Sequence, residues 1–164
     1  MKQFIVLLLA AASFAILAPA SVSAQASDDA SHDVSIIVQE INAIEVGGNV
    51  DIVLDAAAPG EAPTPKTAAS TYAMTTNSSA ARKITAILSA EYAGNIQLSV
   101  ELDAPSTGQS VGQQLLNASD ATDLVTDIAP TSETDLGITY TAEASATDAP
   151  GTYTQTVTYT ILAQ

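Results

Sequence analysis

The stretch Gly151-Thr-Tyr-Thr-Gln-Thr-Val-Thr-Tyr-Thr-Ile-Leu162, near the end of the chain, decides the fold. From Tyr153 to Ile161, apolar side chains alternate with threonines, and Gln155 is the one polar interruption of the apolar face. This two-residue period in β-branched and aromatic side chains is typical of a β-strand, because successive side chains of a strand point to opposite faces. A helix would scatter the same residues around its circumference. The sequence therefore predicts a strand over residues 151–162.

The first 24 residues predict a secretory signal peptide. Lys2 precedes an apolar run from Phe4 to Leu17, and the segment ends in Val22-Ser-Ala24. A positive start, an apolar run and a small-x-small ending are the features of a cleavable leader, and the run is shorter than the ~20 residues of a membrane-spanning helix. We expect cleavage after Ala24, no membrane insertion afterwards, and a location in the periplasm, at the cell surface or outside the cell.

The net charge limits the partners that we expect, and the lack of cysteine limits how the fold can be stabilised. The chain of 164 residues carries a formal charge of −14 and contains no cysteine. Such an acidic surface repels nucleic acid and anionic lipid, so neither is an expected partner. Without disulfides, an exported domain must be stabilised by its hydrophobic core alone, which a domain of this size can achieve.

The amino-acid composition gives little support for a catalytic site. His32 is the only histidine, and it lies in residues 25–33, which we interpret as a flexible acidic tail that offers nothing to hold a catalytic imidazole. The chain has no tryptophan and 4% aromatic residues, which disfavours the aromatic platforms that usually accompany glycoside hydrolysis. We therefore predict that the protein is not an enzyme and needs no cofactor.

Residues 34–164 predict a single all-β domain of about eight strands. Besides the last strand, the expected strands are 34–46 (bent near residues 39–42), 50–54, 71–76, 83–88, 96–102, 111–116, 123–128 and 136–142. Lys83–Leu88 and Ile96–Leu102 are expected to pair as a hairpin around Ala93-Gly-Asn95. The leading architecture is an antiparallel β-sandwich, and a small closed barrel is the alternative. Expected core residues are Ile36, Val38, Ile52, Leu54, Tyr72, Met74, Ile84, Ile87, Leu98, Val100, Ile138, Tyr140, Val157 and Tyr159, whereas Tyr92 is expected to be exposed.

The closing segment also resembles a known group of proteins. Gly151-x-Tyr153 followed by alternating threonine and apolar residues is similar to the last strand of secreted fibre-subunit sandwiches of the spore coat U and fimbrial-subunit type. The resemblance covers about a dozen residues. It implies an immunoglobulin-like subunit of an extracellular appendage or coat, although this chain lacks the cysteines common in that group.

Calcium is the one metal with some support in the sequence. Five acidic residues lie in one loop-rich stretch: Asp120, Asp123, Asp127, Glu133 and Asp135. Loop carboxylates are typical Ca²⁺ ligands, but the spacing fits neither an EF-hand nor a repeat-type Ca²⁺ loop. A solvated acidic surface is the alternative interpretation.

We expect a secreted, non-enzymatic surface, coat or fibre subunit that assembles with copies of itself through β-strand edges. Residues 34–46 are the candidate donor strand, since apolar residues follow a polar tail there; alternatively, they form the first strand of their own domain. The competing function is a monomeric extracellular module that binds a ligand or calcium through its loops 56–67 and 117–135.

Overall fold

The computed structural model describes residues 29–164, and the predicted signal peptide lies outside them. The chain divides into two units, residues 1–37 and 38–164. In the first unit, the described residues 29–37 contain neither helix nor strand. The second unit is an all-β domain, and no helix long and apolar enough to cross a membrane occurs among the described residues.

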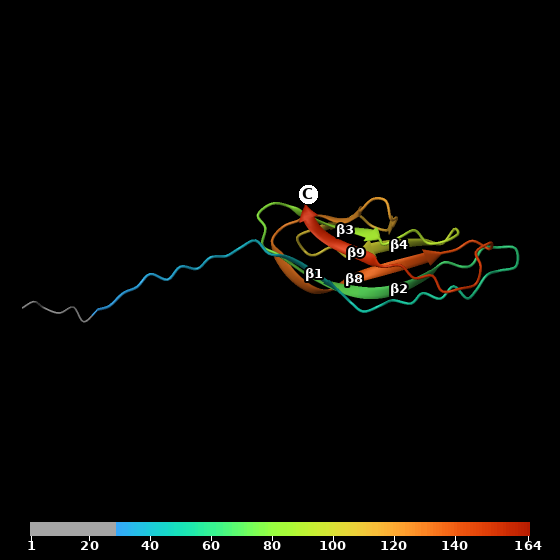
Figure 1. Cartoon of the computed structure of the whole chain (residues 1–164), viewed down its shortest axis with the longest axis horizontal. Coiled ribbons are helices and arrows are strands. Elements are labelled where there is room, and N and C mark those ends of the chain that lie inside the picture. Colours follow the sequence, from blue (N-terminus) through green and yellow to red (C-terminus); the bar gives the residue numbers. More distant parts are fainter. Residues whose placement is uncertain (1–28) are drawn as a thin grey trace, which may run out of the picture. The chain divides into compact units, whose positions relative to one another are not determined.

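Within residues 29–164, nine antiparallel strands form two sheets, which confirms the predicted β-sandwich. Figure 1 shows how the labelled strands are arranged. The five-stranded sheet has the order β1-β2-β8-β4-β6, and the four-stranded sheet has the order β5-β7-β3-β9. The strands are β1 (Asn42–Val46), β2 (Lys66–Thr76), β3 (Arg82–Leu88), β4 (Gln97–Leu102), β5 (Gln109–Ser110), β6 (Gln114–Leu115), β7 (Thr122–Ile128), β8 (Thr131–Glu143) and β9 (Val157–Ala163).

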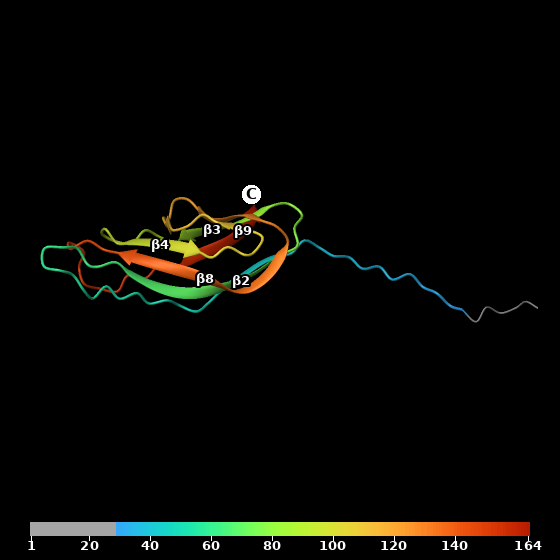
Figure 2. The same cartoon turned by 180° about the vertical axis from the view of Figure 1, so that it is seen from behind.

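Neighbouring strands in the sequence often belong to different sheets. The predicted hairpin of β3 and β4 is wrong, because β3 pairs with β7 and β9, whereas β4 pairs with β8 and β6. Both strands bury one face, so each needs a facing sheet, and their connection crosses from one sheet to the other. Figure 2 shows β2, β8 and β4 side by side in the five-stranded sheet.

The core lies between the two sheets and follows the alternation of the central strands. Leu98, Val100 and Leu102 of β4 point inward, as the sequence predicts, and Tyr72 and Ile138 are almost completely buried. Met74 and Ile84 are also confirmed as core, whereas Ile87 is only half-buried because its neighbours Ala86 and Leu88 face inward. Tyr92 is half-buried against the core instead of exposed.

The last strand is shorter than predicted. β9 begins at Val157, and residues 151–156 lie outside any strand. Tyr153 is 37% exposed, and its hydroxyl donates a hydrogen bond to the carbonyl of Ala149 (2.7 Å). The tyrosine therefore closes a local turn instead of extending the apolar face of the strand.

Two predicted strands near the start of the domain are also corrected. Only Asn42–Val46 of the segment 34–46 is a strand, paired with β2. Ile36 and Val38, expected in the core, are 85% and 77% exposed. Residues 50–54 form no strand, although Val50, Ile52 and Leu54 are half-buried and alternate with exposed residues.

Candidate self-association interface

The most exposed apolar segment is Val34–Val38, which we call the donor segment. Its four large apolar side chains are 74–85% exposed. They include both residues of the pair Ile36-Ile37, so the segment presents apolar side chains on both faces of an extended chain. Within residues 29–164, no hydrogen bond joins the donor segment to another residue. Both its side chains and its backbone groups are therefore available to a partner.

A side-chain clamp fixes the chain directly after the donor segment. The Asn77 side chain accepts a hydrogen bond from the Ile41 amide (2.7 Å) and donates one to the Gln39 carbonyl (2.9 Å). The Asn77 amide in turn donates to the Ile41 carbonyl (3.2 Å). Because Gln39 and Ile41 present their backbone groups to the same side, Asn77 binds them as a neighbouring strand would. The clamp therefore holds residues 39–41 extended, in line with β1.

Charge reinforces the clamp. The guanidinium of Arg82 forms an ion pair with the Glu40 carboxylate and donates to the Ser78 hydroxyl (2.7 Å). The Ser78 hydroxyl also donates to Glu40 (3.4 Å), and the side-chain amide of Asn42 donates to the same carboxylate (2.9 Å). The Arg82 side chain is only 12% exposed, so this ion pair is partly shielded from water. We use the name clamp for Asn77, Ser78 and Arg82 together with residues 39–41.

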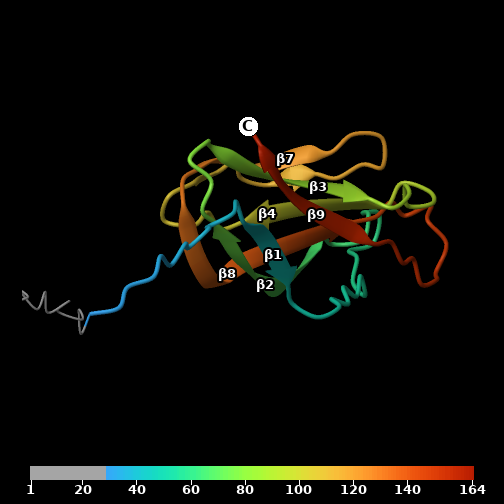
Figure 3. The same ribbon diagram turned by 60° about the vertical axis from the view of Figure 1, so that its left-hand side comes forward.

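The outer side of β9 is an open sheet edge. On its inner side β9 pairs with β3: Ser89 donates to the Thr156 carbonyl (2.9 Å), and Gln164 donates to the Ala81 carbonyl (3.2 Å). Since hydrogen-bonding direction alternates along a strand, the backbone groups of Val157, Tyr159 and Ile161 point the other way. No strand pairs with that side among the described residues. Figure 3 shows β9 at the margin of its sheet, with β1 of the other sheet nearby.

The apolar side chains of β9 are less buried than those of the central strands of the same sheet. Val157, Tyr159 and Ile161 pack against the core but are only half-buried, whereas Ile84 and Leu124 of the central strands β3 and β7 are fully buried. A further strand on the open edge would cover these three side chains and satisfy the backbone groups beside them. The other outer strand of this sheet, β5, has two residues and offers a much shorter edge.

Two tyrosine hydroxyls join the two sheets near this edge. The hydroxyls of Tyr140 on β8 and Tyr159 on β9 lie 2.8 Å apart. Burial raises the pKa of Tyr159 well above its ordinary value, and its hydrogen bond to Tyr140 raises it further. Tyr159 therefore stays protonated, and its hydrogen bond with Tyr140 tethers the edge strand to the facing sheet.

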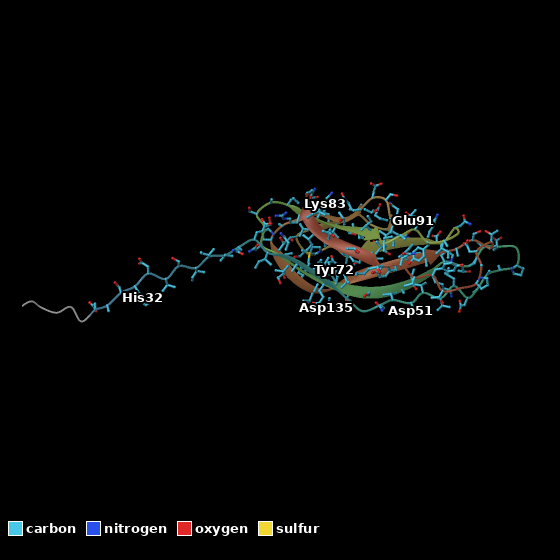
Figure 4. All side chains as sticks on the ribbon, in the orientation of Figure 1. His32, Asp51, Tyr72, Lys83, Glu91 and Asp135 are labelled. Atoms are coloured by element: carbon cyan, nitrogen blue, oxygen red, sulfur yellow. The ribbon has the colours of Figure 1, made fainter. Side chains whose placement is uncertain are left out.

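The five predicted calcium ligands are not gathered into one site. Asp123 pairs with Lys83 (2.9 Å), Asp127 accepts from the Gln164 side chain, and Glu133 accepts from Ser106 (2.7 Å). Hydrogen bonds from Ser106 and Thr131 lower the pKa of Glu133. Figure 4 places Asp135 by the five-stranded sheet, on the opposite side of the domain from Lys83. Within residues 29–164, no three His, Asp or Glu side chains are close enough to hold a metal ion together.

The predicted binding loops contribute little to two open hollows of the described domain. Two open hollows lie over β1, β2 and the start of β8, and residues such as Glu45, Ala73 and Thr134 line both of them. Of the two loops predicted to bind a ligand, residues 56–67 contribute nothing to these hollows, and residues 117–135 contribute only their last four positions.

The sequence contained a signal for the donor segment but not for its anchor. Apolar residues after a polar tail marked residues 34–38, whereas Asn77 looked like an ordinary turn residue in a polar run. No protein family, curated protein or solved structure matches this chain.

Proposed function

We propose that this protein is an exported, non-enzymatic structural subunit that assembles with copies of itself by strand addition. In this arrangement, the donor segment of one copy lies beside the open edge of β9 in a second copy. The observation that carries the proposal is the exposure of the donor segment, which is apolar, extended and without a backbone partner in an otherwise acidic chain.

Strand addition suits both surfaces chemically. A free strand edge binds an extended peptide through backbone hydrogen bonds, and alternate side chains of the peptide fill the apolar positions beneath. With Val34, Ile36 and Val38 facing the core side, the donor would cover the half-buried side chains of β9. Ser35 and Ile37 would face outward, next to the threonines Thr158 and Thr160.

The expected affinity of a single contact is moderate. Complete burial of the three inward-facing side chains, Val34, Ile36 and Val38, contributes about 4.5–9 kcal/mol. Association of two proteins costs about 4–15 kcal/mol in lost translational and rotational freedom and in ordering of the interface. These terms are of similar size, so we expect assembly to depend on protein concentration and to proceed by repetition of one weak contact along a chain of copies.

Removing the donor segment tests this function. We expect residues 25–164 to form species larger than a monomer with increasing concentration, and residues 39–164 to remain monomeric. The shorter chain keeps β1 and the clamp, so it should fold equally well. Size-exclusion chromatography with light scattering gives the masses, and circular dichroism verifies the fold.

A peptide supplies the matched control. A synthetic peptide of residues 33–39 should bind residues 39–164, and the same peptide with Ile36→Asp should not, which isothermal titration calorimetry would detect. A monomer at every concentration for residues 25–164, together with no peptide binding, would overturn the proposed function.

A further inference from the structure

We infer that the clamp decides which β9 edge the donor segment reaches, by preventing it from folding back onto the edge of its own copy. This inference rests on the proposed function and adds a positioning role for Asn77. It concerns the choice between self-pairing and pairing with a second copy, which exposure of the donor segment alone does not determine.

The clamp lies at the end of the open edge. Glu40 is bound by Arg82, and Arg82 is the direct partner of Ala163 in the β3–β9 ladder. Glu40 is therefore connected to the end of β9 through the Arg82 side chain and the β3–β9 pairing. A copy that binds its own donor segment would need no partner, so its own edge is a competitor for every assembly contact.

The chain is long enough for that competition. Five extended residues span about 17 Å, which covers most of the seven residues of β9. To lie there, the donor segment would have to reverse its direction relative to β1, and residues 39–41 would have to form the turn.

The clamp opposes that turn. Three hydrogen bonds between Asn77 and residues 39–41 require an extended backbone, because both Gln39 and Ile41 must face Asn77. A tight turn at these positions would break them. As long as the clamp is closed, residues 39–41 remain extended and cannot form the turn.

Two variants of Asn77 open the clamp to different degrees. Asn77→Ala removes the bonds to the Ile41 amide and the Gln39 carbonyl. Asn77→Asp keeps an acceptor for Ile41 and loses only the donor to Gln39, so it serves if the alanine variant folds poorly. Asn49→Ala is the matched control, because Asn49 is exposed and makes no hydrogen bond to another described residue.

Engineered cysteines report which edge is used, since the natural chain has none. Ser35→Cys and Thr160→Cys would place thiols on the outward face of the paired strands. A chain that carries both cysteines forms an internal disulfide if it pairs with itself. A mixture of the two single-cysteine chains forms a disulfide only between copies. Non-reducing electrophoresis and intact mass separate these products.

We expect the chain with native Asn77 to give disulfides between copies and multimers in solution. With Asn77→Ala or Asn77→Asp, the internal disulfide should increase several-fold and the multimer fraction should fall by a similar factor, while Asn49→Ala behaves like the native chain. Multimers that are unchanged in both Asn77 variants would overturn the inference and leave the proposed function standing. A native chain that is monomeric, with or without an internal disulfide, would overturn both.

Discussion

Residues 34–38 and residues 50–54 have nearly the same sequence character and opposite surroundings. Both are short and rich in valine and isoleucine, and both were predicted as strands. Neither pairs with a strand within residues 29–164. In the second segment Val50, Ile52 and Leu54 are half-buried, and Asp55 beyond it is bound to Lys66 at the start of β2 (3.2 Å). In the first segment every large apolar side chain is exposed.

The difference shows what alternation in a sequence does and does not specify. It specifies an extended segment with one face suited to burial, but the surface that buries this face lies elsewhere. For residues 50–54 the surface is the core of the same domain, which Ile52 contacts. The donor segment has no such surface in its own chain, and we propose that a second copy provides it.

The largest expected effect is on stability. Ile52→Asp places a carboxylate against the core and should lower the free energy of unfolding by about 2–3 kcal/mol. Ile36→Asp changes an exposed residue and should leave the free energy of unfolding of the monomer within about 0.5 kcal/mol. Urea denaturation of both variants measures the contrast. Equal losses in the two variants would show that the donor segment is buried in its own domain.

An effect of about half this size per tyrosine and per pH unit should appear in alkali. Burial raises the pKa of Tyr72, with neighbouring Asp103 and Glu133 raising it further, and burial also raises the pKa of Tyr159. Above pH 10 the unfolded chain loses these protons and the folded chain keeps them, so stability falls as pH rises. Each tyrosine contributes about 1.4 kcal/mol per pH unit.

This alkaline transition also distinguishes the two segments. NMR signals of residues 50–54 should change with unfolding, whereas those of the donor segment in a monomer should hardly move. Burial also raises the pKa of Tyr92, so three tyrosines contribute to the slope of stability against pH, and Tyr72→Phe should reduce that slope by about a third. A slope that is unchanged in this variant would contradict the role of Tyr72.

The smallest difference is expected in the amide exchange of the monomer. Backbone groups of both segments lack partners in the described chain, so their amides should exchange at similar, fast rates. Assembly should then protect the donor segment and the outward amides of Val157, Tyr159 and Ile161, and leave residues 50–54 unchanged. Protection of residues 50–54 instead would indicate that a different edge accepts the donor. Hydrogen exchange with mass spectrometry resolves the segments.

Much of the fold could be predicted because the central strands show a clear alternation of apolar and polar residues. In β4, apolar and polar residues alternate strictly, and the apolar face is buried. Strand pairing could not be predicted, since β3 and β4 follow each other in the chain but belong to different sheets. The end of β8 nearest Thr131 was also missed, because its polar residues Ser132 to Asp135 lack an apolar alternation and owe their extended form to pairing with β2.

The candidate interface could be predicted only in part. Apolar residues marked the donor segment, and the alternation of the last strand marked β9. The open edge could not be found from the sequence, because it depends on which strands pair. The clamp depends on a contact between residues 36 positions apart, and a single asparagine in a polar turn gives no sign of it.

In the proposed assembly, the ion pairs of this domain would affect how two copies meet. Within residues 29–164, all three cationic side chains are already bound to carboxylates of their own chain: Lys66 to Asp55, Arg82 to Glu40 and Lys83 to Asp123. Two approaching copies therefore repel each other over long distances, and no positive patch steers them together. Salt shortens this repulsion from ~30 Å at 0.01 M to ~8 Å at 0.15 M. Ionic strength would thus accelerate the encounter of copies, in contrast to protein pairs steered by opposite charges, which salt slows down.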